Sequence, residues 1–431
     1  MRRSLTIAAT GDSFITRRLP ENDHNSSVIY DIMKQADVRF TNLEVTTHHF
    51  EGFPSAISGG SWSIAEPEVL EDLKKYGVNL IGWATNHALD FSYGGLRATE
   101  RNLNKYNFIH AGAGRNLAEA NEPRYLETVN GRVALISTTS TFHETWRAGE
   151  QRPDIIGRPG VNPLGHNIVY KVSRESMAAL KSIANNVSIN AENDLHVQLG
   201  IKNKTKEDEF LFGEHKFKVG EEEEQVTTPD KEDMKRILKA VSEAKRQADF
   251  VIVSVHSHEM AEGDLEKPPN FLKEFSRECI DRGANAIIGH GPHILRGIEI
   301  YKKSPIFYSL GNFIFQNDTM TKQPMEFYDK HNLDHNSNVA ELFDSRTDKD
   351  TKGFVVDEKV WSSIIPVWKM KDNRIFELTL YPIELGINQA RSQRGWPKLE
   401  KRNDILERLQ TLSEPFGTNI KLSNGLGKVE L

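Results

Sequence analysis

Short apolar runs alternate with amphipathic stretches along most of this chain. The apolar runs read as strands and cover residues 5–10, 38–44, 78–85, 131–139, 249–258 and 286–290. Between them, apolar positions recur with the period of a helix over residues 27–36, 66–77, 94–107, 231–247 and 269–283. A regular exchange of strand and helix patterns is typical of layered α/β domains. The pattern therefore predicts an α/β fold that begins at the first strand.

Two polar stretches interrupt this alternation. Residues 190–230 contain few large apolar side chains and predict a surface insertion that holds one hairpin, whereas residues 317–356 predict a polar, mobile loop or lid. Residues 361–386 then predict two strands that return to a sheet, completing one domain over residues 1–386. Residues 387–431 predict a C-terminal helix and a loose tail that pack on the same domain.

Composition and charge narrow the class of protein. With 431 residues, 38% hydrophobic and 27% charged, the chain has the composition of a globular protein. Its formal charge of -6 offers no global basic field, so neither nucleic acid nor an anionic membrane is an expected partner. The first apolar run is too short for a signal peptide, and no run approaches a membrane span. We therefore expect a cytoplasmic protein; the sequence carries no signal for an oligomeric state.

The lone cysteine, Cys279, lies in a helical pattern and is interpreted as a packed thiol. A single cysteine excludes an internal disulfide framework and suits a reducing compartment.

Polar residues gather where the predicted strands end. Because strand ends converge on one rim of an α/β sheet, residues distant in the sequence meet there. Carboxylate, amide and imidazole groups are ligands of divalent metals such as Mn, Fe or Zn. The pattern predicts a site for one or two such ions, and the residues at the strand ends are Asp12, Asn42, Glu44, Asn86, His87, Asp90, His256, His258, Glu259, His290 and His293.

The order of these motifs resembles a known family. "GD" at 11–12, "NLE" at 42–44, "TNHALDFSYGGL" at 85–96, "HSHE" at 256–259, "GHGPH" at 289–293 and "YSLGNFIF" at 308–315 are similar to motifs of the CapA/PgsA capsule, or poly-γ-glutamate, biosynthesis proteins. That family looks like a branch of the calcineurin-like metallophosphoesterases. The resemblance implies a four-layer α/β/β/α sandwich with surface insertions and a dinuclear metal site.

Roles follow from the resemblance, residue by residue. Glu44 would bridge two metals in the place usually held by Asp, and His87 would be the catalytic acid or base. Asp90 would orient His87 or, equally, cap a turn. His258 would be either a pocket acid or base or a third ligand, whereas Glu259 is interpreted as structural. The remaining expected ligands are Asn86, His256 and His290 at one metal and Asp12 and His293 at the other.

Two departures from the phosphoesterase pattern concern the first metal position. Phe14 stands where that pattern has a histidine, and His290 and His293 are separated by two residues instead of one. Both changes remove or displace a ligand, so a mononuclear enzyme is an alternative to a dinuclear one.

Substrate contacts are predicted from basic and aromatic residues in loops. Arg17 could meet an anionic substrate, and Asn42 lies beside the expected ligands. Arg158 lies in a Pro/Gly-rich loop, and Arg394 and Trp396 could bind a carboxylate and an apolar group.

Four functions are consistent with these residues. The first, implied by the resemblance, is metal-assisted hydrolysis or transfer on a γ-glutamyl polymer or related peptide. The second is metal-dependent peptide epimerisation of the lasso-peptide type, with His87 and His258 exchanging an α-proton. The third is phosphoester hydrolysis, and the fourth is a non-catalytic subunit of a polymer synthase.

Overall fold

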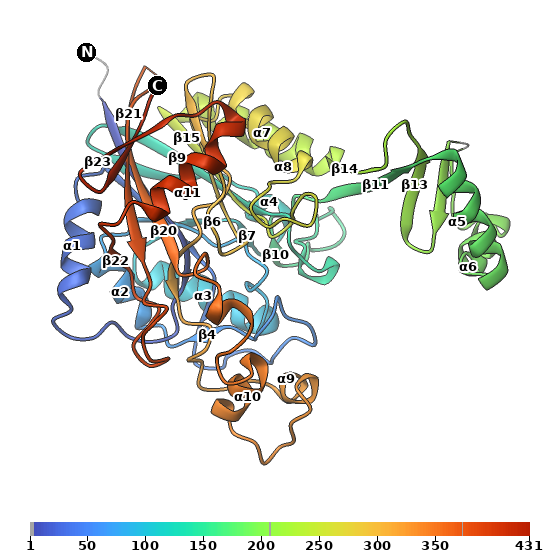
Figure 1. The fold of residues 1–431 in the computed structure, drawn as a ribbon, viewed down its shortest axis with the longest axis horizontal. Helices are drawn as coiled ribbons and strands as arrows, with labels where there is room; N and C mark the ends of the chain where they lie inside the picture. Colours follow the sequence, from blue (N-terminus) through green and yellow to red (C-terminus); the bar gives the residue numbers. More distant parts are fainter. Residues whose placement is uncertain (1–3, 207, 373) are drawn as a thin grey trace.

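Two β-sheets lie face to face at the centre of the molecule (Figure 1). The computed structural model describes residues 4–206, 208–372 and 374–431, so the first three residues of the predicted domain lie outside the described part. The larger sheet has the strand order β23-β24-β21-β20-β1-β2-β5-β6, with β19 also paired to β1 and β22 to β21. Its strands are β1 (Leu5–Phe14), β2 (Val38–Leu43), β5 (Leu80–Gly82), β6 (Ile109–Ala111), β19 (Asn312–Phe315), β20 (Ser362–Lys371), β21 (Arg374–Glu384), β22 (Lys398–Leu399), β23 (Ile420–Ser423) and β24 (Leu426–Val429).

The smaller sheet has the order β17-β18-β16-β15-β9-β8. Three of its strands, β9, β15 and β16, run parallel to one another, as do β1, β2 and β5 in the larger sheet. Its strands are β8 (Arg124–Thr128), β9 (Gly131–Thr139), β15 (Phe250–His256), β16 (Ala286–His290), β17 (Ile298–Tyr301) and β18 (Ser304–Phe307).

Alternation of side chains along each strand builds the layers. Leu5 and Ile7 of β1 point into the core between the two sheets, whereas Ala8 faces the outer core of the larger sheet. In the same way, Ile252 of β15 faces the inner core and Val253 faces the outer core of the smaller sheet. Both faces of these strands are buried, which explains their nearly continuous apolar sequence.

Helices cover both outer faces. Apolar residues of α1 (His24–Met33), α2 (Val69–Lys75) and α3 (Ser92–Lys105) belong to the core outside the larger sheet. Those of α7 (Lys231–Gln247) and α8 (Asn270–Asp281) belong to the core outside the smaller sheet. The resulting α/β/β/α sandwich confirms the predicted fold class.

Helix α7 shows how the local sequence sets an element's bounds. Its N-cap residue Asp230 accepts hydrogen bonds from the backbone N–H groups of Glu232 and Asp233, and its bounds are those predicted from the periodicity. Cys279 is fully buried in α8, as predicted for a packed thiol.

A separate unit protrudes from the body where a polar insertion was expected (Figure 1). It has a four-stranded sheet of order β12-β13-β11-β14 and two helices, so it holds far more than one hairpin and begins before residue 190. Its elements have few buried residues, since the unit exposes most of its surface. They are β11 (His166–Val172), α5 (Arg174–Val187), α6 (Ala191–Gln198), β12 (Glu209–Phe212), β13 (His215–Val219) and β14 (Glu224–Pro229).

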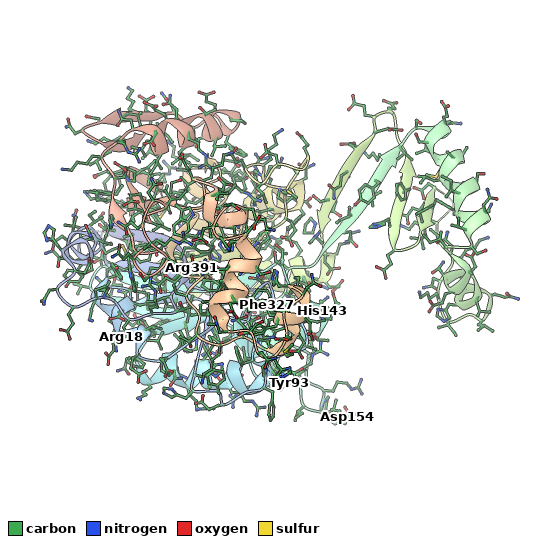
Figure 2. All side chains as sticks on the ribbon, turned by 60° about the horizontal axis from the view of Figure 1, so that its bottom comes forward. Arg18, Tyr93, His143, Asp154, Phe327 and Arg391 are labelled. Atoms are coloured by element: carbon green, nitrogen blue, oxygen red, sulfur yellow. The ribbon has the colours of Figure 1, made fainter. Side chains whose placement is uncertain are left out.

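The segment 317–356 contains two helices, α9 (Met325–Lys330) and α10 (Val339–Thr347). Phe327 of α9 and Phe343 of α10 are buried and belong to the core outside the larger sheet, and Figure 2 shows Phe327 on this unit. The segment expected as a polar loop or lid is therefore anchored by its own apolar side chains.

The C-terminal residues also form regular structure. Helix α11 (Asp404–Ser413) packs Leu406 and Leu409 against the core between the sheets. The tail that the sequence suggested was loose forms the β23–β24 hairpin, whose β24 pairs with β21 and extends the larger sheet.

The remaining elements are short: β3 (Thr46–Thr47), β4 (Ile64–Ala65), β7 (Ala113–Gly114), α4 (Leu117–Ala120) and β10 (Gly160–Val161). Among residues 4–206, 208–372 and 374–431, no helix has both the length and the apolar character needed to traverse a bilayer.

Candidate metal centre

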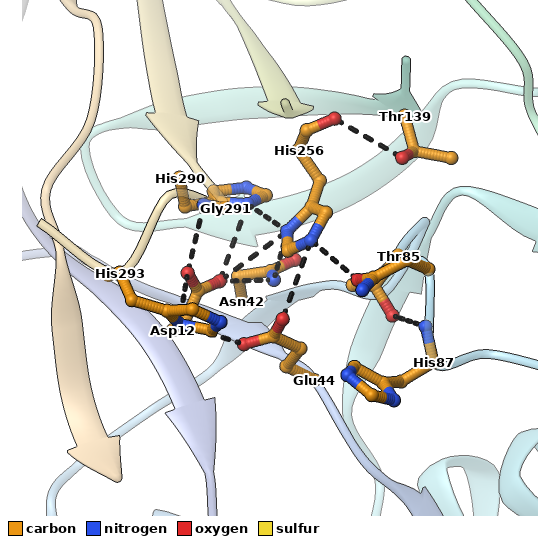
Figure 3. A network of polar contacts seen from close by, with 12 residues as sticks. Asp12, Asn42, Glu44, Thr85, His87, Thr139, His256, His290, Gly291 and His293 are labelled. Carbon is orange, nitrogen blue, oxygen red and sulfur yellow. Dashed lines mark hydrogen bonds and ion pairs between the residues drawn. The ribbon is translucent and has the colours of Figure 1, made fainter. Parts of the chain in front are cut away.

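The C-terminal ends of parallel strands from both sheets meet at one rim of the sandwich (Figure 3). In the larger sheet, Asp12 near the end of β1 pairs in register with Asn42 of β2. In the smaller sheet, His256 at the end of β15 pairs in register with His290 at the end of β16. Sheet register therefore brings two pairs of polar residues, distant in the sequence, to opposite sides of one buried space.

Asp12 is fully buried and fixed at both oxygens. Its Oδ2 accepts a hydrogen bond from the backbone N–H of Gly291 at 2.9 Å, and its Oδ1 accepts one from Asn42 Nδ2 at 2.7 Å. The same Oδ1 lies 3.6 Å from His256 Nδ1 and 3.5 Å from His290 Nδ1. Asn42, predicted to touch substrate, is thus buried within the cluster and positions this carboxylate.

Glu44 follows the end of β2 and faces three imidazoles. Its Oε1 lies 3.5 Å from His256 Nε2 and 3.9 Å from His258 Nε2, and its Oε2 lies 3.8 Å from His293 Nδ1. The side chain is fully buried, yet neither oxygen accepts a hydrogen bond from any residue that the structure describes. A buried carboxylate without donors is costly unless a cation balances it.

Three overlapping sets of ligand atoms each fit within 4.8 Å, the separation expected around one ion. Together they contain two carboxylates and four histidines, a donor set that suits Mn, Fe or Zn. The residues present therefore fit a divalent cation, and the shared members allow one ion or two. The sets are Asp12, His256 and His290; Glu44, His256 and His258; and Asp12, Glu44 and His293.

The "GHGPH" turn aims two histidines into this space. Gly291 has φ of 120° and His293 has φ of 61°, both in the region that L residues rarely adopt. A Cβ on Gly291 would lie 2.8 Å from the backbone nitrogen of Ser257, so the turn requires glycine there. Strained backbone at this point is therefore tied to the placement of both imidazoles.

Hydrogen bonds from outside the cluster orient the same two rings. His290 Nε2 lies 2.8 Å from Ser254 Oγ, and His293 Nδ1 lies 2.9 Å from Asn312 Oδ1. Neither Ser254 nor Asn312 was recognised from the sequence. Two features of the sequence could have indicated them. Ser254 lies two residues before His256, on the same face of the strand, and Asn312 is a polar residue inside the apolar motif "YSLGNFIF".

Burial dominates the electrostatics of the cluster. It lowers the pKa of His290 to about 3 and that of His293 to about 4, so both rings are neutral, the form that binds a metal. Burial, and then the negative charges of Asp12 and Asp90, raise the pKa of Glu44 well above its usual value. Burial would also raise the pKa of Asp12, but the histidines around it, with a hydrogen bond from His256 foremost, lower it instead.

Asn86 and His87 follow β5 of the larger sheet, and Figure 3 shows His87 near Glu44. Asn86 Oδ1 lies 2.8 Å from His256 Nε2. His87 Nδ1 lies 2.6 Å from Asp90 Oδ2, which also accepts a hydrogen bond from the backbone N–H of Ser63 at 2.7 Å. Asp90 therefore fixes the ring of His87, the geometry expected of an orienting carboxylate.

Phe14 occupies the position where phosphoesterases have a histidine. It is fully buried, and its ring packs edge-on against His87 with centroids 5.3 Å apart. An apolar ring here supplies no ligand and instead holds His87 from its other side.

His258 and Glu259 have separate environments. His258 Nε2 lies 3.0 Å from His256 Nε2, and its side chain is 27% exposed, whereas those of Asp12, Glu44 and His256 are fully buried. The centre thus opens toward solvent beside His258. Glu259 accepts hydrogen bonds from hydroxyl groups of Ser140, Thr141 and Ser257, which supports the structural role inferred for it.

Four residues predicted to bind substrate are engaged elsewhere. The buried Arg394 pairs with Asp318 at 2.8 Å and with Asp350 at 3.3 Å. Arg17 donates to the backbone oxygen of Arg394 at 2.7 Å and stacks 5.8 Å from the ring centre of the buried Trp396. The exposed Arg158 donates to the backbone oxygen of Arg147. These contacts tie loops together, a role that loop composition alone did not distinguish from binding.

Comparison with known proteins gives relatives over most of the chain. The family model described as "Bacterial capsule synthesis protein PGA_cap" matches residues 6–317. The uncharacterized protein y4sH of Sinorhizobium fredii is 36% identical over 99% of this chain and 93% of its own length. The capsule biosynthesis protein CapA of Bacillus anthracis is 25% identical over 74% of this chain and 62% of its own length.

Two solved structures resemble the fold distantly. A hypothetical protein from Thermus thermophilus has a TM-score of 0.40 and 10% identity, and covers 88% of this chain and 99% of its own. A putative 5'-nucleotidase from Staphylococcus aureus in complex with α-ketoglutarate has a TM-score of 0.39 and 12% identity, and covers 95% of this chain and 58% of its own.

Proposed function

Because the chain belongs to the bacterial capsule synthesis protein family PGA_cap, we propose that it is a divalent-metal-dependent enzyme that hydrolyses or transfers a γ-glutamyl or related peptide bond. One observation carries this proposal: Glu44 is fully buried, accepts no hydrogen bond from the described residues, and faces three imidazole nitrogens within 3.9 Å. Such a carboxylate costs stability unless it serves a cation.

Some residues of the cluster would bind that cation, and others would orient the ligands. Asp12, Glu44 and the histidines would bind it, and Asn42 and Gly291 would hold Asp12 in place. When bound, the cation would supply Lewis acidity toward a carbonyl oxygen and a water of lowered pKa.

His87 is the proposed proton donor to the leaving nitrogen. Asp90 Oδ2 lies 2.6 Å from His87 Nδ1 and would accept its proton, which leaves Nε2 for the substrate. The fully buried Phe14 packs against the same ring with centroids 5.3 Å apart and restricts its movement. A carboxylate that accepts a hydrogen bond from one ring nitrogen commonly orients an imidazole in this way.

Epimerisation is the second candidate, and it requires His87 and His258 to act as two bases. His258 lies 3.0 Å from His256 Nε2 and 3.9 Å from Glu44 Oε1. Those contacts favour a ligand role for His258 over a base on the far side of a substrate, so we rank hydrolysis or transfer first.

In the test, the metal-loaded protein is incubated with γ-glutamyl oligopeptides in heavy water, and the masses of the peptides are followed by mass spectrometry. Cleavage or transfer products, lost in His87→Gln and retained in His215→Gln on the protruding unit, would support the proposal. Deuterium uptake without cleavage would replace it with epimerisation. Turnover of a chromogenic phosphodiester alone would favour phosphoester hydrolysis, and full biological function in His87→Gln would favour a non-catalytic subunit.

A further inference from the structure

A cavity of about 230 Å³ lies outside the donor cluster, at the junction of β19 and the segment that carries α10. Its walls combine aromatic and aliphatic side chains with two cationic ones. The residues used below are Phe315, Phe343, Arg346, Lys352, Phe354 and Val355.

Two of its walls touch the proposed metal centre. The ring of His293 lies 5.3 Å from that of Phe315 and 5.4 Å from that of Phe354, centroid to centroid. One aromatic ring thus separates the cavity from a proposed ligand.

Arg346 forms no ion pair with any residue that the structure describes. Its Nη1 donates to Asn317 Oδ1 at 3.1 Å, and its guanidinium lies 5.5 Å from the ring centre of Phe327, but no described carboxylate lies within 4.0 Å. Burial, only partly opposed by Asp318, lowers the pKa of Arg346, so the charge is substantially removed from water. A desolvated guanidinium is the group that best receives a carboxylate, through two parallel hydrogen bonds.

The nearby acidic residue compensates Arg346 only in part. Asp318 also lines the cavity, but it is paired with Arg394 at 2.8 Å. Lys352 lines the opening, is exposed, and forms no ion pair with any residue that the structure describes. Arg346, which is half-buried, therefore has no ion-pair partner among the described residues, and the exposed Lys352 is a second positive charge at the same cavity.

We propose that this cavity binds a carboxylate of the substrate through Arg346, with the adjoining apolar atoms against Phe343, Phe354 and Val355. The inference rests on the proposed function and specifies its substrate: an acyl or peptide chain that carries a carboxylate beside apolar atoms. A single desolvated charge matches a monoanion, whereas a phosphate ester would bring two charges against phenyl rings. Lys352 would attract the anion from solvent but, being exposed, would add little to its affinity.

The test measures binding of N-benzoylglycine and its uncharged counterpart N-benzoylglycinamide by calorimetry, with and without bound Mn²⁺. We expect the acid to bind more tightly than the amide, and Arg346→Gln to weaken the acid about 10- to 100-fold, the worth of a charged hydrogen-bond pair. Lys352→Gln should weaken it only about twofold. N-acetylglutamate α-amide, whose one carboxylate is on the side chain, distinguishes a side-chain from a chain-end carboxylate.

Further outcomes separate this inference from the proposed function. Carboxylate binding that needs Mn²⁺ and survives Arg346→Gln would overturn the inference, because the metal alone would then hold the anion. Tighter binding of phenyl phosphate than of N-benzoylglycine would also overturn it. Arginine-dependent binding in a protein that takes up no metal would keep the inference and defeat the proposed function.

A measurement on the unmodified chain tests the same inference without relying on the folding of a variant. Phenylglyoxal should label Arg346 in the free protein, and N-benzoylglycine should protect it, as read by peptide mass spectrometry. Labelling that is unchanged by the ligand would refute binding at this residue.

Discussion

Replacing Glu44 with Gln should have opposite effects on the stability of metal-free and metal-loaded protein. The change keeps the shape of the side chain and removes one of two neighbouring negative charges from a fully buried site. In metal-free protein, loss of a buried carboxyl group that is costly to ionise and has no hydrogen-bond donor should raise the free energy of unfolding by about 1–3 kcal/mol. With metal present, the same change removes a ligand, so stabilisation by the ion should largely disappear.

The size of the expected shift follows from linkage and chain length. A ligand at 100 times its dissociation constant stabilises the folded protein by about 2.7 kcal/mol. For 431 residues at about 2.1 cal/mol/K each, the entropy of unfolding is about 0.9 kcal/mol per kelvin. Metal should therefore raise the Tm of the unmodified protein by about 3 °C, and Glu44→Gln should raise the metal-free Tm by about 1–3 °C.

Differential scanning calorimetry with and without Mn²⁺ or Zn²⁺, alongside elemental analysis, checks both shifts. His215→Gln, a similar change on the protruding unit, should show the full metal-dependent rise. Equal metal content and equal Tm shifts in Glu44→Gln and unmodified protein would refute the assignment of Glu44 as a ligand. A metal-free Glu44→Gln variant that melts several degrees lower would refute the argument that its charge is uncompensated.

Three other outcomes are expected. His87→Gln should lower kcat about 10²- to 10⁴-fold at unchanged metal content, measured by steady-state kinetics and elemental analysis; loss of metal would make His87 a ligand instead. Arg394→Ala should lower the free energy of unfolding by about 3–5 kcal/mol in urea titrations, because it strands the buried carboxylate of Asp318; an unchanged midpoint would show that the pair is dispensable. Burial, then the charge of Arg124, lowers the pKa of His110 from 6.5 to about 4, so its unfolded form binds the extra proton and stability falls as pH drops from 6.5 to 4. His110→Gln should therefore lose about 2 kcal/mol less than the unmodified protein between pH 7 and pH 5 in urea titrations; parallel losses would contradict the shift.

The strands that carry the site were predictable because they are buried on both faces. A nearly continuous apolar run such as residues 250–255, followed by His-Ser-His, identifies a central strand and its polar tip at once. The protruding unit was not predictable to the same degree. Its helix α5 has apolar residues at helical spacing, but only Met177 and Ala184 are buried, so the pattern does not show that a separate unit forms.

The role of a basic loop residue is also a tertiary property. Arg394 and Arg346 look alike in sequence, and both are largely removed from solvent. Arg394 forms an ion pair with Asp318, whereas the guanidinium of Arg346 contacts an amide oxygen and the ring of Phe327 and has no ion pair with any residue that the structure describes. Whether an arginine holds a loop or receives a ligand depends on which carboxylates the fold brings within reach.

The α/β alternation and the ordered set of candidate donors at strand ends could be read from the chain alone, because hydrophobic periodicity and residue chemistry are local. Which of those donors share a space depended on the folded arrangement. Asp12 and His290 are far apart along the chain, and register in two separate sheets, together with the left-handed turn at His293, brings their side chains to within 3.5 Å. Distances across two sheets depend on packing of the core between them, which no short stretch of sequence encodes.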